Sequence, residues 1–270
     1  MTNEFILTEP WLAALDTTSR RTYALVEDLS PDQLALQSFD KEWNIGQVLS
    51  HLGSGAEIGT GLIERALAGE TTGLDREMAL PIWQRWDAMT PVEQREAWYE
   101  SDALYRTALA SLMALDPEKL EVLRIPFFAG PVTVSVFAGY RLSEQAVHGW
   151  DIAVTLDPAS AILEPELSLL WERIDGVASR VRDAAVLERL RPQTIAVTLT
   201  DLDETYRLDL ASELHLVADQ RMASASATGT LAGLGEAVLR IVYGRNRPED
   251  EIEISGAVTL GDYRALFPGF

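Results

Sequence analysis

The sequence predicts an α+β protein in which an N-terminal four-helix bundle is followed by a smaller C-terminal α/β domain. Apolar residues recur at helical spacing through the first two-thirds of the chain, and near residue 192 they change to the alternation typical of strands. With 270 residues, the chain is long enough for two domains. We therefore expect a helical domain over residues 1–160, a linking helix within 161–192 and an α/β domain over 193–270.

Four long amphipathic segments account for the first domain. They cover approximately residues 12–29, 45–67, 91–112 and 133–155. The first ends near "SPDQ", whose serine and proline suit a turn or a new helix start. A proline-containing connection, "RIPFFAGPV", leads into the fourth. Four helices of this length predict an antiparallel bundle.

The second domain is expected to combine short strands with two helices. An amphipathic helix over residues 167–181, closed before Arg191-Pro192, leads into it. The alternating pattern then predicts strands over 194–200, 206–210, 214–218 and 223–229, a helix over 231–242, a strand over 252–255 and a terminal helix from about Thr259.

Composition excludes several classes of function. The chain has 42 acidic and 22 basic residues and a formal charge of -20, which disfavours nucleic-acid and membrane-surface partners. No segment looks like a signal peptide or a membrane-spanning helix, so we expect a cytoplasmic protein. With no cysteine in the chain, disulfides and any thiol nucleophile of the protein itself are excluded. Thiol chemistry, if it occurs, needs a thiol that arrives as a cofactor.

The stretch "SEQAVHGWD" contains the first candidate site. Glu144 and His148 are four residues apart, so they project from the same face of the predicted fourth helix and can reach one ion. Arg141 and Asp151 flank them on the same stripe. The pattern has two interpretations: a solvated helix face with an ordinary Glu–His pair, or the lining of a site inside the bundle.

A histidine on the second helix favours a metal site. His51 lies at the edge of an apolar stripe, where an unpaired imidazole is costly to bury, although a lone histidine there is usually a satisfied core residue. Together with Glu144 and His148 it can supply three ligands and leave one position open, as in catalytic zinc sites. Zinc suits nitrogen and oxygen ligands best, while ligand type alone also allows iron, nickel or manganese.

Two motifs resemble a known family. "WNIGQVLSHL" (43–52) resembles the Trp-x(7)-His-Leu signature of DinB-like helical bundles. "RLSEQAVHGWDIA" (141–153) is similar to the fourth-helix motif of mycothiol-dependent maleylpyruvate isomerases and related thiol transferases. The resemblance covers most of the chain and implies a metal-binding bundle joined to a domain similar to sterol carrier proteins. It also implies that His51, Glu144 and His148 bind the metal and that mycothiol is the thiol cofactor.

The resemblance further suggests roles for residues around the metal. The family places an arginine of the second domain over the active site; Arg245 of "VYGRNRP" is the better match and Arg247 the alternative. A surface arginine at a helix end is an equally simple interpretation of either residue. We expect Arg245 or Arg141 to hold a substrate carboxylate or to stabilise oxyanion charge.

The expected reaction is addition of a metal-activated thiolate to an electrophilic substrate. With a maleylpyruvate-type substrate the outcome is cis–trans isomerisation, and release of the adduct would instead be S-transfer. Trp43 and Trp150 flank the proposed ligands and are candidates for the wall of the thiol pocket. Asp151 is expected to support a metal ligand from behind or to cap the helix. The partners are thus a small-molecule thiol and an electrophile, and the sequence does not indicate an oligomeric state.

Three alternatives remain open at this stage. The chain can be a metal-dependent hydrolase, a transferase that uses another low-molecular-weight thiol, or a sterol-carrier-like binding protein without catalysis.

His215 is expected to be a solvent-exposed strand residue, because alternation places it opposite Leu214 and Leu216. Gly53, Gly55, Gly59 and Gly61 form no phosphate loop and are expected to let a helix or ligand approach closely.

Overall fold

The computed structural model describes residues 8–128, 130–222 and 226–269. The chain divides into two compact units, of which the first ends at Glu166 and the second begins at Leu167. The first is helical apart from one short hairpin, and the second contains a five-stranded sheet. The predicted α+β fold class is confirmed.

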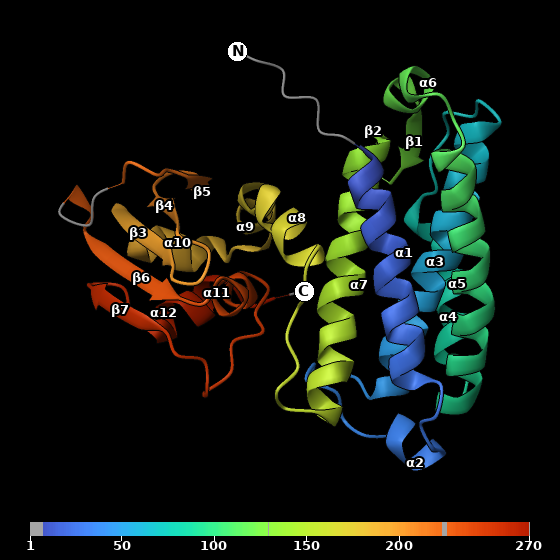
Figure 1. Cartoon of the computed structure of the whole chain (residues 1–270), viewed down its shortest axis with the longest axis horizontal. Coiled ribbons are helices and arrows are strands. Elements are labelled where there is room, and N and C mark those ends of the chain that lie inside the picture. Colours follow the sequence, from blue (N-terminus) through green and yellow to red (C-terminus); the bar gives the residue numbers. More distant parts are fainter. Residues whose placement is uncertain (1–7, 129, 223–225, 270) are drawn as a thin grey trace. The chain divides into compact units, whose positions relative to one another are not determined.

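The first unit is built around four long helices, which Figure 1 labels α1, α3, α5 and α7. They are α1 (Thr8–Val26), α3 (Ile45–Leu67), α5 (Pro91–Met113) and α7 (Val134–Leu156). Helix α3 packs along α5 and α1 packs along α7, with further contacts between α3 and α7. These are the four helices that the apolar spacing predicts, and their bounds differ from the expected ones by a few residues.

Local sequence signals set where these helices begin and end. Asn44 Oδ1 accepts a hydrogen bond from Gln47 N, and Gln47 Oε1 accepts one from Asn44 N, so the two side chains satisfy amides that the first turn leaves unpaired. At the start of α7, Thr133 Oγ1 accepts a single cap hydrogen bond from Val136 N. Gly69 has a φ of 78°, a conformation that ends α3 without a steric penalty.

Shorter helices join the four long ones. "SPDQ", which suits a turn or a new helix start, begins the short helix α2 (Pro31–Leu34), whereas the sequence pattern does not predict α4 (Arg76–Asp87) between α3 and α5. A further short helix, α6 (Pro117–Val122), follows α5. The proline-containing connection that leads into the fourth helix forms an antiparallel hairpin of β1 (Arg124–Phe127) and β2 (Gly130–Thr133).

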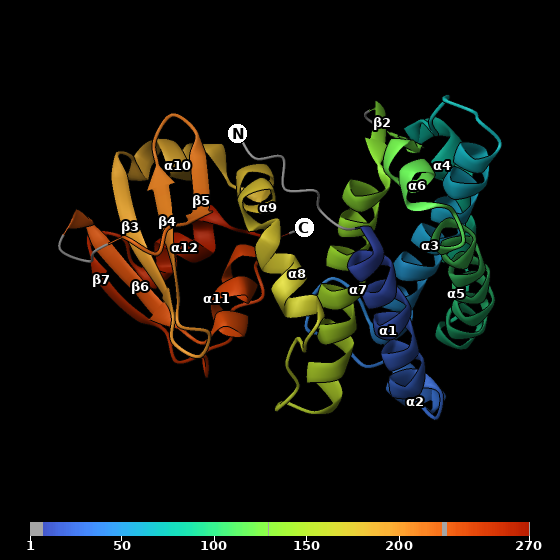
Figure 2. The same cartoon turned by 45° about the horizontal axis from the view of Figure 1, so that its top comes forward.

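The second unit contains a mixed sheet (Figure 2). Its strands are ordered β5-β4-β3-β6-β7, with β3 parallel to β6 and every other pair antiparallel. Their bounds are β3 (Gln193–Leu199), β4 (Glu204–Leu210), β5 (Leu214–Ala218), β6 (Gly229–Gly233) and β7 (Glu253–Gly256). Along β4, Tyr206, Leu208 and Leu210 are buried in alternation, which is the period that predicts the strand.

Three expectations for this part of the chain, two about helices and one about a strand, need correction. The expected helix over 167–181 is broken into α8 (Glu166–Glu172) and α9 (Ile174–Val181), and α10 (Ala184–Leu190) follows before the first strand. Leu231 belongs to β6, and the next helix, α11 (Gly235–Val242), starts later than predicted. The strand expected over 223–229 lies partly outside the described residues, and β6 begins only at Gly229. The terminal helix α12 (Leu260–Leu266) begins after Thr259, as expected.

The core of the bundle holds the site in place. Leu49 and Leu52, on either side of the His51 turn, pack with Trp86 and Trp98 from the neighbouring helices and with Ile152 of α7. No helix in the described part of the chain is long and apolar enough to cross a membrane.

Candidate metal centre

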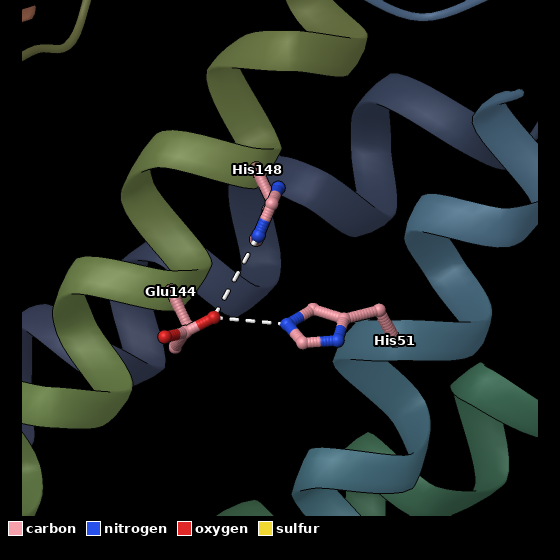
Figure 3. Close-up of side chains that lie close together, drawn as sticks. All are labelled: His51, Glu144 and His148. Carbon is pink, nitrogen blue, oxygen red and sulfur yellow. Dashed lines mark hydrogen bonds and ion pairs between the residues drawn. The ribbon is translucent and has the colours of Figure 1, made fainter. Parts of the chain in front are cut away.

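Two helices of the bundle bring three potential metal ligands together (Figure 3). His51 lies in the second turn of α3, and Glu144 and His148 lie one turn apart on α7. Because Asn44 caps α3 and Thr133 caps α7, the start of each helix is fixed. The side chain of His51 points toward α7, and those of Glu144 and His148 point toward α3.

The three side chains converge on one oxygen atom. Glu144 Oε2 is 2.9 Å from His51 Nε2 and 3.6 Å from His148 Nε2. The two imidazole rings lie at 71° to one another with their centroids 4.8 Å apart. One ligand atom from each residue falls within 4.8 Å of the others. Two imidazole nitrogens and a carboxylate oxygen are a ligand set of catalytic zinc sites, so the residues present fit such an ion.

The burial of the three residues leaves one side of the cluster open. The side chain of His148 is 1% exposed, whereas those of Glu144 and His51 are 24% and 36% exposed. A closed structural zinc site surrounds its ion with four protein ligands. Here a further ligand can approach from the side of Glu144 and His51, as a catalytic site requires.

A buried carboxylate orients His148. Asp151 is fully buried, and its Oδ2 lies 3.0 Å from His148 Nδ1. A hydrogen bond from Nδ1 to a carboxylate leaves Nε2 as the ligand nitrogen and fixes the plane of the ring. The backbone of Asp151 accepts a hydrogen bond from Phe39 N, which ties α7 to the segment before α3. This places Asp151 in the supporting position that the sequence suggests.

The electrostatics of the cluster favour the protonation states that bind a metal. Burial alone would raise the pKa of Glu144, but its hydrogen bond with His51 and the nearby charges of His148 and Arg141 lower that pKa to about 2. Burial lowers the pKa of His51, and the hydrogen bond to Glu144 opposes this only in part. Near neutral pH the cluster therefore offers a carboxylate and a neutral His51 imidazole.

The two candidate tryptophans lie in different surroundings. The ring of Trp43 lies with its centroid 4.9 Å from that of His51 and 5.5 Å from that of His148, so it forms part of the site. Trp150 packs edge-on against Phe39, and its Nε1 donates a hydrogen bond to Ser160 O. Trp43 is thus a wall of the cluster, while Trp150 lines a separate cavity.

Arg141 lies beside the cluster but is buried. Its guanidinium lies over the ring of Tyr105 at 5.3 Å and donates a hydrogen bond to Leu52 O. A Cβ at Gly55 would overlap with Arg141 Nη1, so this glycine makes room for the arginine. Gly53 and Gly59 are similarly close to aromatic rings, and nothing lies near Gly61. The close approach expected at the glycines is therefore made by side chains of the bundle.

Arg245 and Arg247 belong to the second unit. Arg245 is buried and donates a hydrogen bond to Tyr243 O. Arg247 donates through its backbone N and its Nε to the carboxylate of Asp250. Their role at the metal centre remains a prediction.

His215 is exposed on β5, as the alternation predicts, and lies 3.3 Å from Asp175.

Asp40 is a residue near the site that sequence reasoning misses. A carboxylate oxygen of Asp40 lies within 4.8 Å of ligand atoms of His148 and Asp151. Asp40 precedes α3, within the same "FDKEWN" segment that contains Trp43. Asp40 lies in an irregular segment, where the sequence gives no periodic signal for the direction of a side chain.

Comparisons with known proteins agree with the fold. Residues 15–153 match the family model described as the mycothiol maleylpyruvate isomerase N-terminal domain. Two similar solved structures are the crystal structure of the mycothiol-dependent maleylpyruvate isomerase and that of its histidine-to-alanine mutant. Each is 14% identical to this chain. Each match covers 93% of this chain and 95% of the solved chain, with a TM-score of 0.66. A search of curated proteins found no match.

Proposed function

Because the chain belongs to the mycothiol maleylpyruvate isomerase family, we propose that it is a metal-dependent enzyme that uses mycothiol to isomerise a maleylpyruvate-type substrate. The family resemblance of the two sequence motifs is thereby confirmed, and with it the assignment to an isomerase class of enzymes. The convergence of His51, Glu144 and His148 carries the proposal for the metal.

Zinc is the proposed ion. The cluster offers two imidazole nitrogens and one carboxylate oxygen, and zinc accepts this combination with a fourth position available. The negative charge of the Glu144 carboxylate attracts a divalent cation more strongly than two neutral imidazoles alone would. When bound, the metal would favour the thiolate form of the mycothiol thiol and so would supply a nucleophile for an electrophilic double bond of the substrate.

The residues of the chain hold this chemistry in position. Asp151 keeps His148 in the tautomer whose Nε2 faces Glu144. Trp43 covers the two histidine rings and limits the access of water on that side. Arg141 adds a fixed positive charge beside Glu144, which favours an anionic group near the open side. We propose that Arg245 holds a substrate carboxylate.

We propose that the second unit is a sterol-carrier-like domain. The mixed sheet and its helices α9, α11 and α12 support this assignment, as does the coverage of 93% in the structural comparison. The domain limits expected from the sequence, residues 1–160, 161–192 and 193–270, are part of the same proposal.

The test measures metal and activity together. Metal content of the purified wild type and of Glu144→Ala is determined by mass spectrometry, and isomerisation of maleylpyruvate is followed with and without mycothiol. We expect zinc at about one ion per chain in the wild type. We also expect activity only with mycothiol, and a metal affinity that falls by more than about 100-fold in Glu144→Ala, because even loss of an outer partner costs 10–100-fold.

The matched control is His215→Ala, which removes the third histidine of the chain from an exposed position. It should keep the metal and the activity of the wild type. Unchanged metal content in Glu144→Ala would refute the ligand assignment. Activity with a different thiol, release of a thiol adduct, or hydrolysis without any thiol would replace the isomerase proposal with the corresponding transferase or hydrolase.

A further inference from the structure

Arg141 of α7 is a buried cation that forms no ion pair within the described part of the chain. It is 8% exposed, and its guanidinium carbon lies 5.3 Å from the ring centroid of Tyr105. Arg240, which is also buried, is instead paired with Glu236 and Asp250. An aromatic ring attracts a cation but carries no net charge, so the charge of Arg141 calls for an anion from outside the chain.

Two carboxylates of the bundle are directed to other groups. Glu144 Oε2 faces the two histidines of the metal centre, and Asp102 of α5 pairs with Arg106. Neither carboxylate therefore serves as the direct counter-ion of Arg141.

The three nitrogens of the Arg141 guanidinium differ in what can reach them. Nε is fully buried without a hydrogen-bond partner, and Nη2 donates to Leu52 O at 3.3 Å. Nη1 has no hydrogen-bond partner among the residues that the structure describes, and it is not one of the atoms that are closed off from solvent. Nη1 is therefore the nitrogen that an incoming anion can contact.

A glycine of α3 makes the room that Nη1 occupies. Gly55 is half-buried and follows His51 by four residues, so both lie on the face of α3 that is turned toward α7. A Cβ at Gly55 would overlap with Arg141 Nη1. Any side chain at position 55 would therefore displace the end of the arginine from its place over the helix.

The metal ligands lie at one end of this slot, and aromatic rings close the other. Arg141 precedes Glu144 by three residues and Gly55 follows His51 by four, so the arginine lies about one helical turn from the metal centre. The exposed parts of Glu144 and His51 mark the open side. In the next turn of α3, a Cβ at Gly59 would come within 2.8 Å of the ring of Tyr105, so the bundle is tightly packed there.

We propose that Arg141 Nη1, over Gly55, is an anion subsite that holds one carboxylate of the substrate, and that Gly55 keeps this subsite open. The inference rests on the proposed function, because it assigns the carboxylate to the substrate of the metal centre. A maleylpyruvate-type substrate carries two carboxylates, so one remains for Arg245. A carboxylate accepts a charge-assisted hydrogen bond from Nη1, which is roughly twice as strong as the bond that a neutral amide would accept. The subsite therefore selects short dicarboxylates over their uncharged analogues.

The test compares succinate with succinamide, which has the same carbon chain without the charges. Each is titrated calorimetrically into the full chain as purified, without mycothiol. We expect saturable binding of succinate and binding of succinamide that is at least about tenfold weaker. Equal binding of the two probes, or no saturable binding of succinate, would overturn the inference.

A matched pair of glycine variants locates the binding. Gly55→Ala displaces the flexible end of Arg141 and should weaken succinate binding at least about tenfold, with the metal content per chain unchanged. Gly61→Ala makes the same change at another half-buried position of α3, where nothing lies within 4 Å, and should bind like the wild type. Should Gly55→Ala fail to fold, Arg141→Met removes the donor with an apolar side chain of similar length and is read in the same way.

Isomerisation kinetics separate this inference from the proposed function. If the carboxylate is held equally before and during the reaction, Gly55→Ala raises KM at least about tenfold and changes kcat much less. Activity in which Gly55→Ala matches Gly61→Ala in both KM and succinate affinity would overturn the inference and leave the proposed function standing. Succinate binding that depends on Gly55, in a protein that does not isomerise maleylpyruvate, would overturn the proposed function and with it the substrate assigned to the subsite.

Discussion

Each unit of the protein contains a cluster of charged groups, and the two clusters differ in whether they are complete. In the second unit, Arg240 is 1% exposed and donates to Glu236 at 2.7 Å and to both oxygens of Asp250 at 2.6 and 2.8 Å. A further bond reaches Arg245 O. The positive charge, two carboxylates and their geometry are all supplied by the chain.

In the cluster of the first unit, two imidazole nitrogens and a carboxylate oxygen lie within 4.8 Å of one another. His51 and His148 both direct Nε2 toward Glu144, and a neutral imidazole can donate only one hydrogen bond. The same three atoms are well placed to share one ion. Buried charge by itself therefore says little about function; the informative feature is whether the partners of each group lie within the chain.

The largest expected effect comes from breaking the complete cluster. Arg240→Met removes the buried cation and leaves Asp250 with only Asn246 and Arg247 as donors. We expect the free energy of unfolding to fall by about 3–5 kcal/mol, as is typical when one member of a buried pair is deleted. Chemical denaturation followed by circular dichroism measures this, and the metal content per folded chain should stay unchanged.

Arg189→Met is the matched control for that experiment. Arg189 pairs with Asp262 at 2.8 Å, but its side chain is 56% exposed. A surface pair contributes at most about 1 kcal/mol, so this variant should remain close to the wild type. Equal stability of the two variants would mean that the Arg240 cluster does not hold the second unit together.

A smaller effect is expected when the metal cluster loses its orienting group. Asp151→Asn keeps the size of the side chain but removes the charge that faces His148 Nδ1. Outer partners of metal-binding histidines typically contribute 10–100-fold to affinity, so we expect a loss of about that size in a competition titration with a zinc chelator. Asp157→Asn, an exposed change just after α7, serves as the control. Unaltered affinity in Asp151→Asn would show that His148 needs no orienting carboxylate.

The two clusters also differ in how far the sequence predicts them. Glu144 and His148 share a helix, so their four-residue spacing alone places them on one face. His51 is predictable because the apolar stripe of α3 fixes which side of that helix faces the bundle. Asp40 lies in an irregular segment, and no periodicity reports where its side chain points.

Other differences arise where local patterns meet tertiary constraints. The predicted helix over 167–181 has a continuous apolar face, yet the chain breaks it between Glu172 and Ile174. The hairpin of β1 and β2 contains two prolines, which argue against a strand unless the strand lies at an edge. In Arg240, the sequence shows only an i,i+4 pair with Glu236, because Asp250 is brought to it by the loop after α11.

The smallest effect is the pH dependence that Glu144 gives to the metal-free protein. Its pKa in the folded chain is lowered to about 2 from the ordinary 4.5, so it stabilises the fold above about pH 4.5, and this stability is lost as the pH falls toward 2. The loss is about 1–2 kcal/mol, less than the shift alone implies, because water reaches part of the side chain.

Denaturation of the chelator-treated wild type and of Glu144→Gln between pH 6 and pH 2.5 measures this loss as a difference in the slope of the unfolding free energy against pH. Glu118→Gln, an exposed change on α6, should keep the slope of the wild type. Parallel profiles for the wild type and Glu144→Gln would indicate that the imidazoles do not stabilise the carboxylate, and that the cluster is held together in some other way before any metal binds.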